Sequence, residues 1–128
     1  MIKGIGIDIS DKRRMQDTLL RLGDKFLQRV LTPDEIGAMP SQEGRQVEYV
    51  AGRFAAKEAF AKATGWGIGK DLSWQDMTII SDDLGKPVMN LSHQWLETHD
   101  PERLLAFHVS ISHEKNYAVA QVIIEEIR

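Results

Sequence analysis

The sequence predicts an α+β domain in which an antiparallel sheet packs against a long central helix. Residues 2–9 alternate between isoleucine and glycine or a polar residue, which is typical of a β-strand. Two β-rich segments, 107–112 and 117–124, are separated by a short polar link and indicate a hairpin. Residues 45–64 have the length and spacing of a helix with apolar side chains on two sides. Such a helix is expected to run through the middle of a domain.

Length and composition limit the possible classes of protein. A chain of 128 residues can form the core of one domain and is short for two, so we expect a single domain over residues 1–128. The net charge of −3 argues against a general nucleic-acid binder, which needs a basic surface. Because the chain has no cysteine, any metal must be held by oxygen or imidazole ligands.

Nothing in the sequence predicts a membrane protein. No apolar run approaches the roughly 18 residues that span a bilayer, and the first ten residues lack the apolar core of a signal peptide. We therefore expect a cytoplasmic protein without a membrane partner.

The first strand places an acid beside two glycines. Asp8 shares its face with Gly4 and Gly6, whereas the isoleucines lie on the other face. Glycine weakens a strand unless another element or a ligand must approach the backbone closely. Asp8 is therefore either part of a tightly packed site or an ordinary helix-capping acid at a strand end.

The next segment predicts a basic helix. Ser10 or Asp11 is the expected N-cap and Gly23 the expected C′ residue, with an apolar side formed by Met15, Leu19 and Leu22. Residues 11–29 contain six basic side chains and three acids, and Arg14 and Arg21 share one helical face. This local positive charge indicates either a solvated surface or a docking surface for an acidic partner.

The middle of the chain predicts two further helices. Thr32, Pro33 and Glu35 have the spacing of a capping box and start a short helix that reaches about Met39. The long helix begins near Arg45 and ends before the glycines that follow Thr64.

Glu58 is the unusual residue of the long helix. At about 100° per residue it lies among Ala51, Phe54, Ala55 and Ala61, with Lys62 one turn further on, so we expect the carboxylate to be largely buried. A buried carboxylate needs a partner or a metal. The simpler alternative is an ion pair between Glu58 and Lys62.

The last third of the chain predicts two pairs of strands. Residues 77–81 and 88–91 are joined by a turn in which Gly85 is expected at positive φ and Lys86 lies at the tip. A short helix over 92–99 precedes the C-terminal hairpin, and His113 lies at the end of its first strand. Lys86 and His113 are each either surface residues or ligand contacts.

Three stretches resemble one family when they are taken together: GIGIDI at 4–9, GRFAAKEAFAKATG at 52–65 and SISHEKNYAVAQV at 110–122. The shorter pieces FLQRVLTPDE, GIGKDLSWQD and DLGKP fit the same family in the same order, at 26–35, 67–76 and 83–87. The chain resembles the small trimeric 4′-phosphopantetheinyl transferases, the holo-[acyl-carrier-protein] synthases, over nearly its whole length. The order and spacing of the motifs make the resemblance specific.

The resemblance implies a Mg²⁺-dependent transfer of the 4′-phosphopantetheine arm of coenzyme A to a serine of apo acyl carrier protein. It implies that Asp8 and Glu58 are the magnesium ligands and that Lys62 contacts the phosphates. Mg²⁺ prefers one or two carboxylates together with phosphate oxygens and waters. Asp8, Glu58 and Lys62 are therefore the expected catalytic residues.

The same resemblance implies a homotrimer with the coenzyme in a cleft between two subunits. The expected coenzyme contacts, besides Lys62, are Arg45, Arg53, Gly85, Lys86, Pro87, Ser112 and His113. Arg14 and Arg21 are the expected contacts to the acidic carrier protein.

Two other classes of function are compatible with parts of this pattern. A magnesium-dependent nucleotide hydrolase would explain the two acids and Lys62, but it would leave the basic helix unexplained. A non-catalytic module that binds coenzyme A or a partner helix would fit the composition and would form no covalent product.

Overall fold

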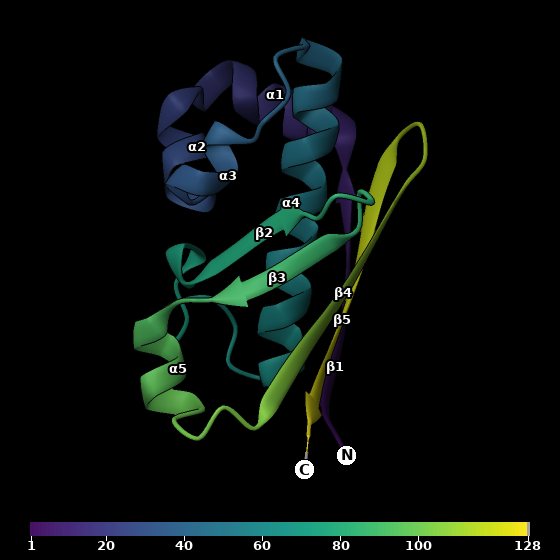
Figure 1. The fold of residues 1–128 in the computed structure, drawn as a ribbon. Helices are drawn as coiled ribbons and strands as arrows, with labels where there is room; N and C mark the ends of the chain where they lie inside the picture. Colours follow the sequence, from purple (N-terminus) through teal and green to yellow (C-terminus); the bar gives the residue numbers. More distant parts are fainter. Residues whose placement is uncertain (128) are drawn as a thin grey trace.

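The computed structural model describes residues 1–127 and has an α+β architecture, as expected (Figure 1). In chain order the elements are β1 (Ile2–Asp11), α1 (Lys12–Leu22), α2 (Asp24–Val30), α3 (Pro33–Gly37), α4 (Glu43–Thr64), the 3₁₀ turn η1 (Trp74–Asp76), β2 (Met77–Ser81), β3 (Pro87–Leu91), α5 (His93–His99), β4 (Leu105–His113) and β5 (Tyr117–Glu126). The predicted strands and the long helix are all present, whereas α2 and η1 were not predicted.

Two antiparallel sheets pack on different sides of α4. One has the strand order β1-β5-β4 and the other is the β2-β3 hairpin. One core cluster includes Phe60 of α4, Ile79 of β2, Met89 of β3 and Val122 of β5, which places α4 in the interior. Figure 1 shows the β2–β3 hairpin in front of α4, with α5 on one side of the helix and the larger sheet on the other. The central position expected of this helix is confirmed.

Helix α4 is buried on nearly all sides because its sequence is rich in alanine. Small side chains let neighbouring backbones approach closely, and seven apolar residues of α4 are at most 1 % exposed: Val50, Ala51, Ala55, Ala56, Ala59, Phe60 and Ala61. The helix ends at Gly65, whose φ of 82° is left-handed and whose N–H donates to Ala61 O and Lys62 O.

The glycine face of β1 lies directly on α4. A Cβ atom added to Gly4 would lie 2.1 Å from Ala63 O, and one added to Gly6 would lie 1.8 Å from Ala59 O. Both distances are far below van der Waals contact, so only glycine permits this approach. The glycines thus reflect close packing of a neighbouring element, which was one of the predicted explanations.

Strand β1 runs directly into α1. Asp11 is the N-cap, and its side chain accepts hydrogen bonds from the N–H groups of Arg13 and Arg14. The alternative cap, Ser10, is buried within β1. The prediction that Leu22 lies on the inward side of α1 was wrong, since it is 46 % exposed. Gly23, at φ 55°, ends α1 and starts α2, so the chain turns sharply there.

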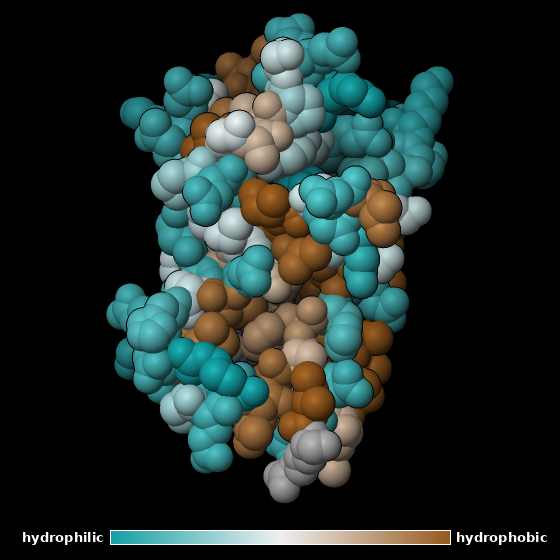
Figure 2. All heavy atoms as spheres, viewed as in Figure 1, coloured by the Kyte–Doolittle hydropathy of each residue, from teal (hydrophilic) through white to brown (hydrophobic). Residues whose placement is uncertain are grey.

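The surface of the molecule is partly apolar. Figure 2 shows hydrophobic side chains gathered over the middle of one face, at β3 and between α5 and β4, with hydrophilic side chains around them. Leu84 at the β2–β3 turn is 94 % exposed. Within residues 1–127, no helix combines the length and the apolar character needed to cross a bilayer.

The contact between β1 and α4 generates the first prediction. Gly6→Ala should destabilise the protein by about 2–3 kcal/mol, because the new methyl group must push β1 away from Ala59. Gly44→Ala is the control, since nothing lies within 4 Å of its added Cβ and alanine favours the first turn of α4. Urea unfolding should separate the two variants; equal stabilities would contradict the packing described here.

Candidate functional site

Asp8, Glu58 and Lys62 come together at the β1 edge of the larger sheet. The Lys62 ammonium donates to Asp8 Oδ1 at 2.9 Å and to Ile7 O at 3.0 Å, which ties the C-terminal half of α4 to β1. The close glycine contact brings the two elements near enough for this pair to form. The structure therefore gathers the three residues expected at the catalytic centre.

Glu58 is only half-buried, so the expectation that it is largely buried was wrong in degree. The physical reason is that β1 is an edge strand and leaves this side of α4 partly open. Burial raises the pKa of the Glu58 carboxyl, the negative charge of Asp8 raises it further, and Lys62 lowers it. The alternative Glu58–Lys62 ion pair is not formed within the described part of the chain, where Lys62 pairs with Asp8.

The two carboxylates fit a magnesium ion whose other ligands are phosphate oxygens and waters. Within residues 1–127, no cluster of three or more histidine, cysteine, aspartate or glutamate side chains is arranged to hold a metal. Asp8 and Glu58 nevertheless lie near enough for the charge of one to shift the pKa of the other. Since Mg²⁺ needs only one or two carboxylates when phosphate oxygens complete its shell, this pair matches the predicted site.

The fully buried charge of α4 is Lys57, which sequence reasoning missed. Its side chain and that of Glu35 are both 0 % exposed, and Lys57 Nζ lies 2.6 Å from Glu35 Oε1. A usable signal was present, because Lys57 shares a helical face with the apolar Val50, Phe60 and Ala61.

Ser112 and His113 lie on β4, at the opposite edge of the sheet. The His113 ring packs over Gly52, where an added Cβ would lie 3.0 Å from His113 Cε1. Its Nδ1 is 3.6 Å from Glu48 Oε1. Burial lowers the pKa of His113 and outweighs the opposite effect of Glu48, which favours the neutral ring at pH 7.

Arg53 is a well-fixed residue rather than a mobile surface cation. It is 8 % exposed, its guanidinium donates to Ile79 O at 3.3 Å and to Ser81 Oγ at 3.4 Å, and it stacks over the Tyr49 ring. It therefore connects α4 to β2, the strand that leads into the turn of Gly85 and Lys86.

The remaining residues expected at the coenzyme are accessible. Lys86 is exposed on the β2–β3 turn, and Gly85 has the positive φ that was predicted, at 85°. Pro87 is half-buried at the start of β3, and Arg45 is exposed in the first turn of α4.

One chain separates the predicted site into two groups. Asp8 lies on β1 and His113 on β4, with β5 between them, so their strands are roughly 10 Å apart. Around the axis of α4, Glu58 and Arg53 are about 140° apart. Asp8 and Glu58 form one group of site residues, and Arg53 and His113 form the other. The two groups thus lie on different sides of α4.

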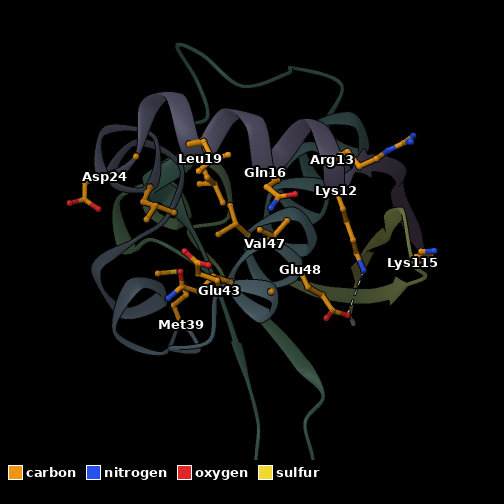
Figure 3. Close-up of a pocket in the computed structure, with 16 residues that line it drawn as sticks. Lys12, Arg13, Gln16, Leu19, Asp24, Met39, Glu43, Val47, Glu48 and Lys115 are labelled. Atoms are coloured by element: carbon orange, nitrogen blue, oxygen red, sulfur yellow. Dashed lines mark ion pairs between the residues drawn. The ribbon is translucent and has the colours of Figure 1, made fainter.

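A groove of about 660 Å³ is formed between α1, α2 and the start of α4, and its lining includes Leu19, Leu27 and Val47 (Figure 3). Neither Asp8 nor Glu58 lines it. Arg14 and Arg21 are exposed and lie on roughly the opposite side of α1.

The sequence and the fold match a known class of protein. The family model of the 4′-phosphopantetheinyl transferase superfamily matches residues 4–122. Because this match covers most of the chain, the protein belongs to that superfamily and is a phosphopantetheinyl transferase.

Individual relatives narrow the class. The chain is 49 % identical to the holo-[acyl-carrier-protein] synthase of Geobacillus kaustophilus over 130 residues, which covers 99 % of this chain and 92 % of the relative. A crystal structure of the Bacillus anthracis holo-(acyl-carrier-protein) synthase in complex with CoA (3′,5′-ADP) has a TM-score of 0.83 and 45 % identity, with 98 % of each chain covered. The Helicobacter pylori holo-[acyl-carrier-protein] synthase in complex with coenzyme A has a TM-score of 0.83 and 34 % identity, and the match covers 94 % of this chain and 99 % of that one.

The electrostatic coupling of the two carboxylates gives a pH prediction. Asp8→Asn should lower the pKa of Glu58 toward its ordinary value, because it removes a repelling charge and releases Lys62. A carboxyl whose pKa is higher in the folded than in the unfolded protein contributes stability below its unfolded pKa, and this stability is lost as pH rises through its folded pKa. Because Asp8→Asn brings the two pKa values of Glu58 closer together, the variant should lose less stability between them than the unmodified protein does.

Carbon-13 NMR of the Glu58 carboxyl, without metal, measures this shift directly. Asp17→Asn, on the exposed face of α1, is the control and should leave the Glu58 titration where it was. An unchanged Glu58 pKa in Asp8→Asn would show that the two carboxylates do not interact.

Proposed function

We propose that this protein transfers the 4′-phosphopantetheine group from coenzyme A to a serine of apo acyl carrier protein, with release of adenosine 3′,5′-bisphosphate. The observation that carries the proposal is the pair of Asp8 and Glu58, with Lys62 bound to Asp8 at 2.9 Å, in a chain of this superfamily. Two close carboxylates and a lysine are suited to a metal-assisted phosphoryl transfer.

Asp8 and Glu58 would hold the magnesium ion, which would neutralise charge on the pyrophosphate. Lys62 is 56 % exposed in its side chain and is positioned to contact phosphate oxygens while it stays near Asp8. The serine oxygen forms a bond to the phosphorus of the phosphopantetheine arm as the bond to the bisphosphate breaks. The hydroxyl proton goes to Glu58, whose carboxyl pKa is raised by burial and by the charge of Asp8.

The coenzyme contacts are proposed to come from a neighbouring subunit. Arg45, Arg53, Lys86 and His113 supply positive charge or hydrogen-bond donors for the 3′-phosphate and adenosine, and the remaining contacts are Gly85, Pro87 and Ser112. A single chain holds the two groups on different sides of α4. A cleft between two copies allows the carboxylates of one chain to face the arginines of the next.

The outer face of the larger sheet is suited to hold these copies together. Ile5, Ile7 and Ile9 are about 60 % exposed, and they lie beside Ile123, Gln121 and Val119 in the register of β1 with β5. A sheet face that exposes several large apolar side chains is a typical protein interface. We propose a homotrimer in which these faces surround the threefold axis.

Carrier-protein docking is proposed for the basic side of α1. Arg14 and Arg21 are exposed on one face of this helix, and an acidic enzyme with a local basic helix is suited to attract an acidic partner. The expected cytoplasmic location stays a prediction.

The proposed reaction is tested by mass spectrometry of apo acyl carrier protein incubated with this protein, coenzyme A and Mg²⁺. The carrier should gain the mass of one phosphopantetheine arm, and Glu58→Gln should reduce the rate by about 100-fold or more. Hydrolysis of the coenzyme without carrier modification would favour the nucleotide-hydrolase alternative. Binding without any covalent change, with several carrier proteins, would favour a non-catalytic module.

The proposed trimer is tested by Ile7→Lys. A charge in the middle of the isoleucine face should convert the trimer to monomers in sedimentation velocity, and transfer should be lost because the two groups of site residues no longer meet. Leu20→Lys is the matched control, since Leu20 is 79 % exposed on α1 and away from the sheet. A trimer that persists in Ile7→Lys would contradict the interface, and full activity of a monomer would contradict the shared site.

A further inference from the structure

The buried pair of Lys57 and Glu35 has no part in the proposed chemistry. Lys57 Nζ donates to Glu35 Oε1 at 2.6 Å, to Val30 O at 2.7 Å and to Trp74 O at 3.2 Å, so all its donors are used. Lys57 directly precedes Glu58 in α4, so the two side chains leave the helix about 100° apart and Lys57 does not share the face of Glu58. Replacing a buried ion pair with apolar residues is often neutral or stabilising, so stability alone is a weak reason for this one.

The Glu35 carboxylate is equally saturated. Oε1 accepts from Thr32 N at 2.8 Å as part of the capping box of α3, and Oε2 accepts from Ile79 N of β2 at 2.8 Å. The pair therefore joins the end of α2, the start of α3, η1 and β2 to one position of α4. These hydrogen bonds are directional, and they fix orientation as well as distance.

The elements joined at this point carry the separate groups of proposed functional residues. The α1–α2 segment bears Arg14 and Arg21. Strand β2 leads into the turn of Lys86 and accepts the hydrogen bonds of Arg53. Helix α4 bears Glu58 and Lys62.

We propose that Lys57 and Glu35 are positioning residues that fix the carrier-docking helix and the β2–β3 turn relative to Glu58. This inference rests on the proposed transferase function. It gives Lys57 and Glu35 a role in that function without contact to either substrate. Reactant placement has large effects on rate, since an error near 1 Å can cost about 100-fold. Loss of the pair should therefore reduce turnover much more than it reduces the binding of either substrate.

The test uses the double variant Lys57→Met with Glu35→Gln, which removes both charges together and leaves no buried ion without its partner. Trp95→Leu is the stability control, because Trp95 is 4 % exposed in α5 and belongs to the other part of the core. The melting temperature of each full-length protein is measured first. The Kd of coenzyme A, the Kd of apo carrier protein and kcat are then measured at one temperature at which all the variants are folded.

In the double variant, both Kd values should stay within about 3-fold of the unmodified protein while kcat falls by roughly 30- to 100-fold. The Trp95→Leu protein should show a lower melting temperature with kcat nearly unchanged. The charge-conserving variant Lys57→Arg with Glu35→Asp should recover part of the lost turnover.

A double variant with the same kcat as Trp95→Leu would overturn the inference and leave the transferase function intact. Absence of transfer by the unmodified protein would overturn both. If the double variant does not fold, Lys57→Arg with Glu35→Asp decides by the same comparison of kcat with the two Kd values, since it keeps both charges and changes only the geometry of the pair.

Discussion

The close approach of β1 to α4 is the contact on which the site depends. Gly4 and Gly6 let the strand lie against the carbonyl groups of Ala63 and Ala59, at distances that no side chain would permit. This approach places Asp8 beside the turn of α4 that carries Glu58 and Lys62. An edge strand held so close gives a carboxylate pair that is partly dry yet open on one side, as a site shared with a phosphate ligand requires.

Helix α4 determines how the remaining functional residues are distributed. It passes from His113 on β4, near Gly52, to the glycine face of β1, near Ala63, and so crosses the sheet diagonally. Its two sides therefore serve different purposes: one presents carboxylates, and the other holds Arg53 against β2. Because Glu58 and Arg53 are about 140° apart around α4, they face different sides of the helix within one chain. In the proposed trimer, a neighbour packed on the exposed isoleucine face would supply the second group of site residues.

The two acidic residues of greatest interest differ in how their charge is compensated. Glu35 is completely buried and has Lys57 and two backbone N–H groups as partners, so its charge is satisfied within the fold. Glu58 is half-buried, is repelled by Asp8 and has a raised pKa. A carboxyl that the fold leaves incompletely compensated is typical of a functional group, whereas a saturated one supports the structure.

The sequence by itself determined the local elements and predicted the acids of the candidate site. Alternation in residues 2–9, the capping box at Thr32 and the glycine after Thr64 are local signals, and each was confirmed within a few residues. The acids Asp8 and Glu58 were also identified from their unusual neighbours and from the resemblance. Helix α2 was missed, because Gly23 ends one helix and begins the next with no side-chain cap.

Only the tertiary structure decided which charges are buried and which residues meet. Helical periodicity placed Glu58 on an apolar face, but it could not show that the covering strand is an edge strand. The same periodicity offered Lys57 on another apolar face, and its partner Glu35 lies 22 positions away in the chain. Burial and pairing depend on contacts between distant segments, and a local pattern contains no information on which segment will cover a given face.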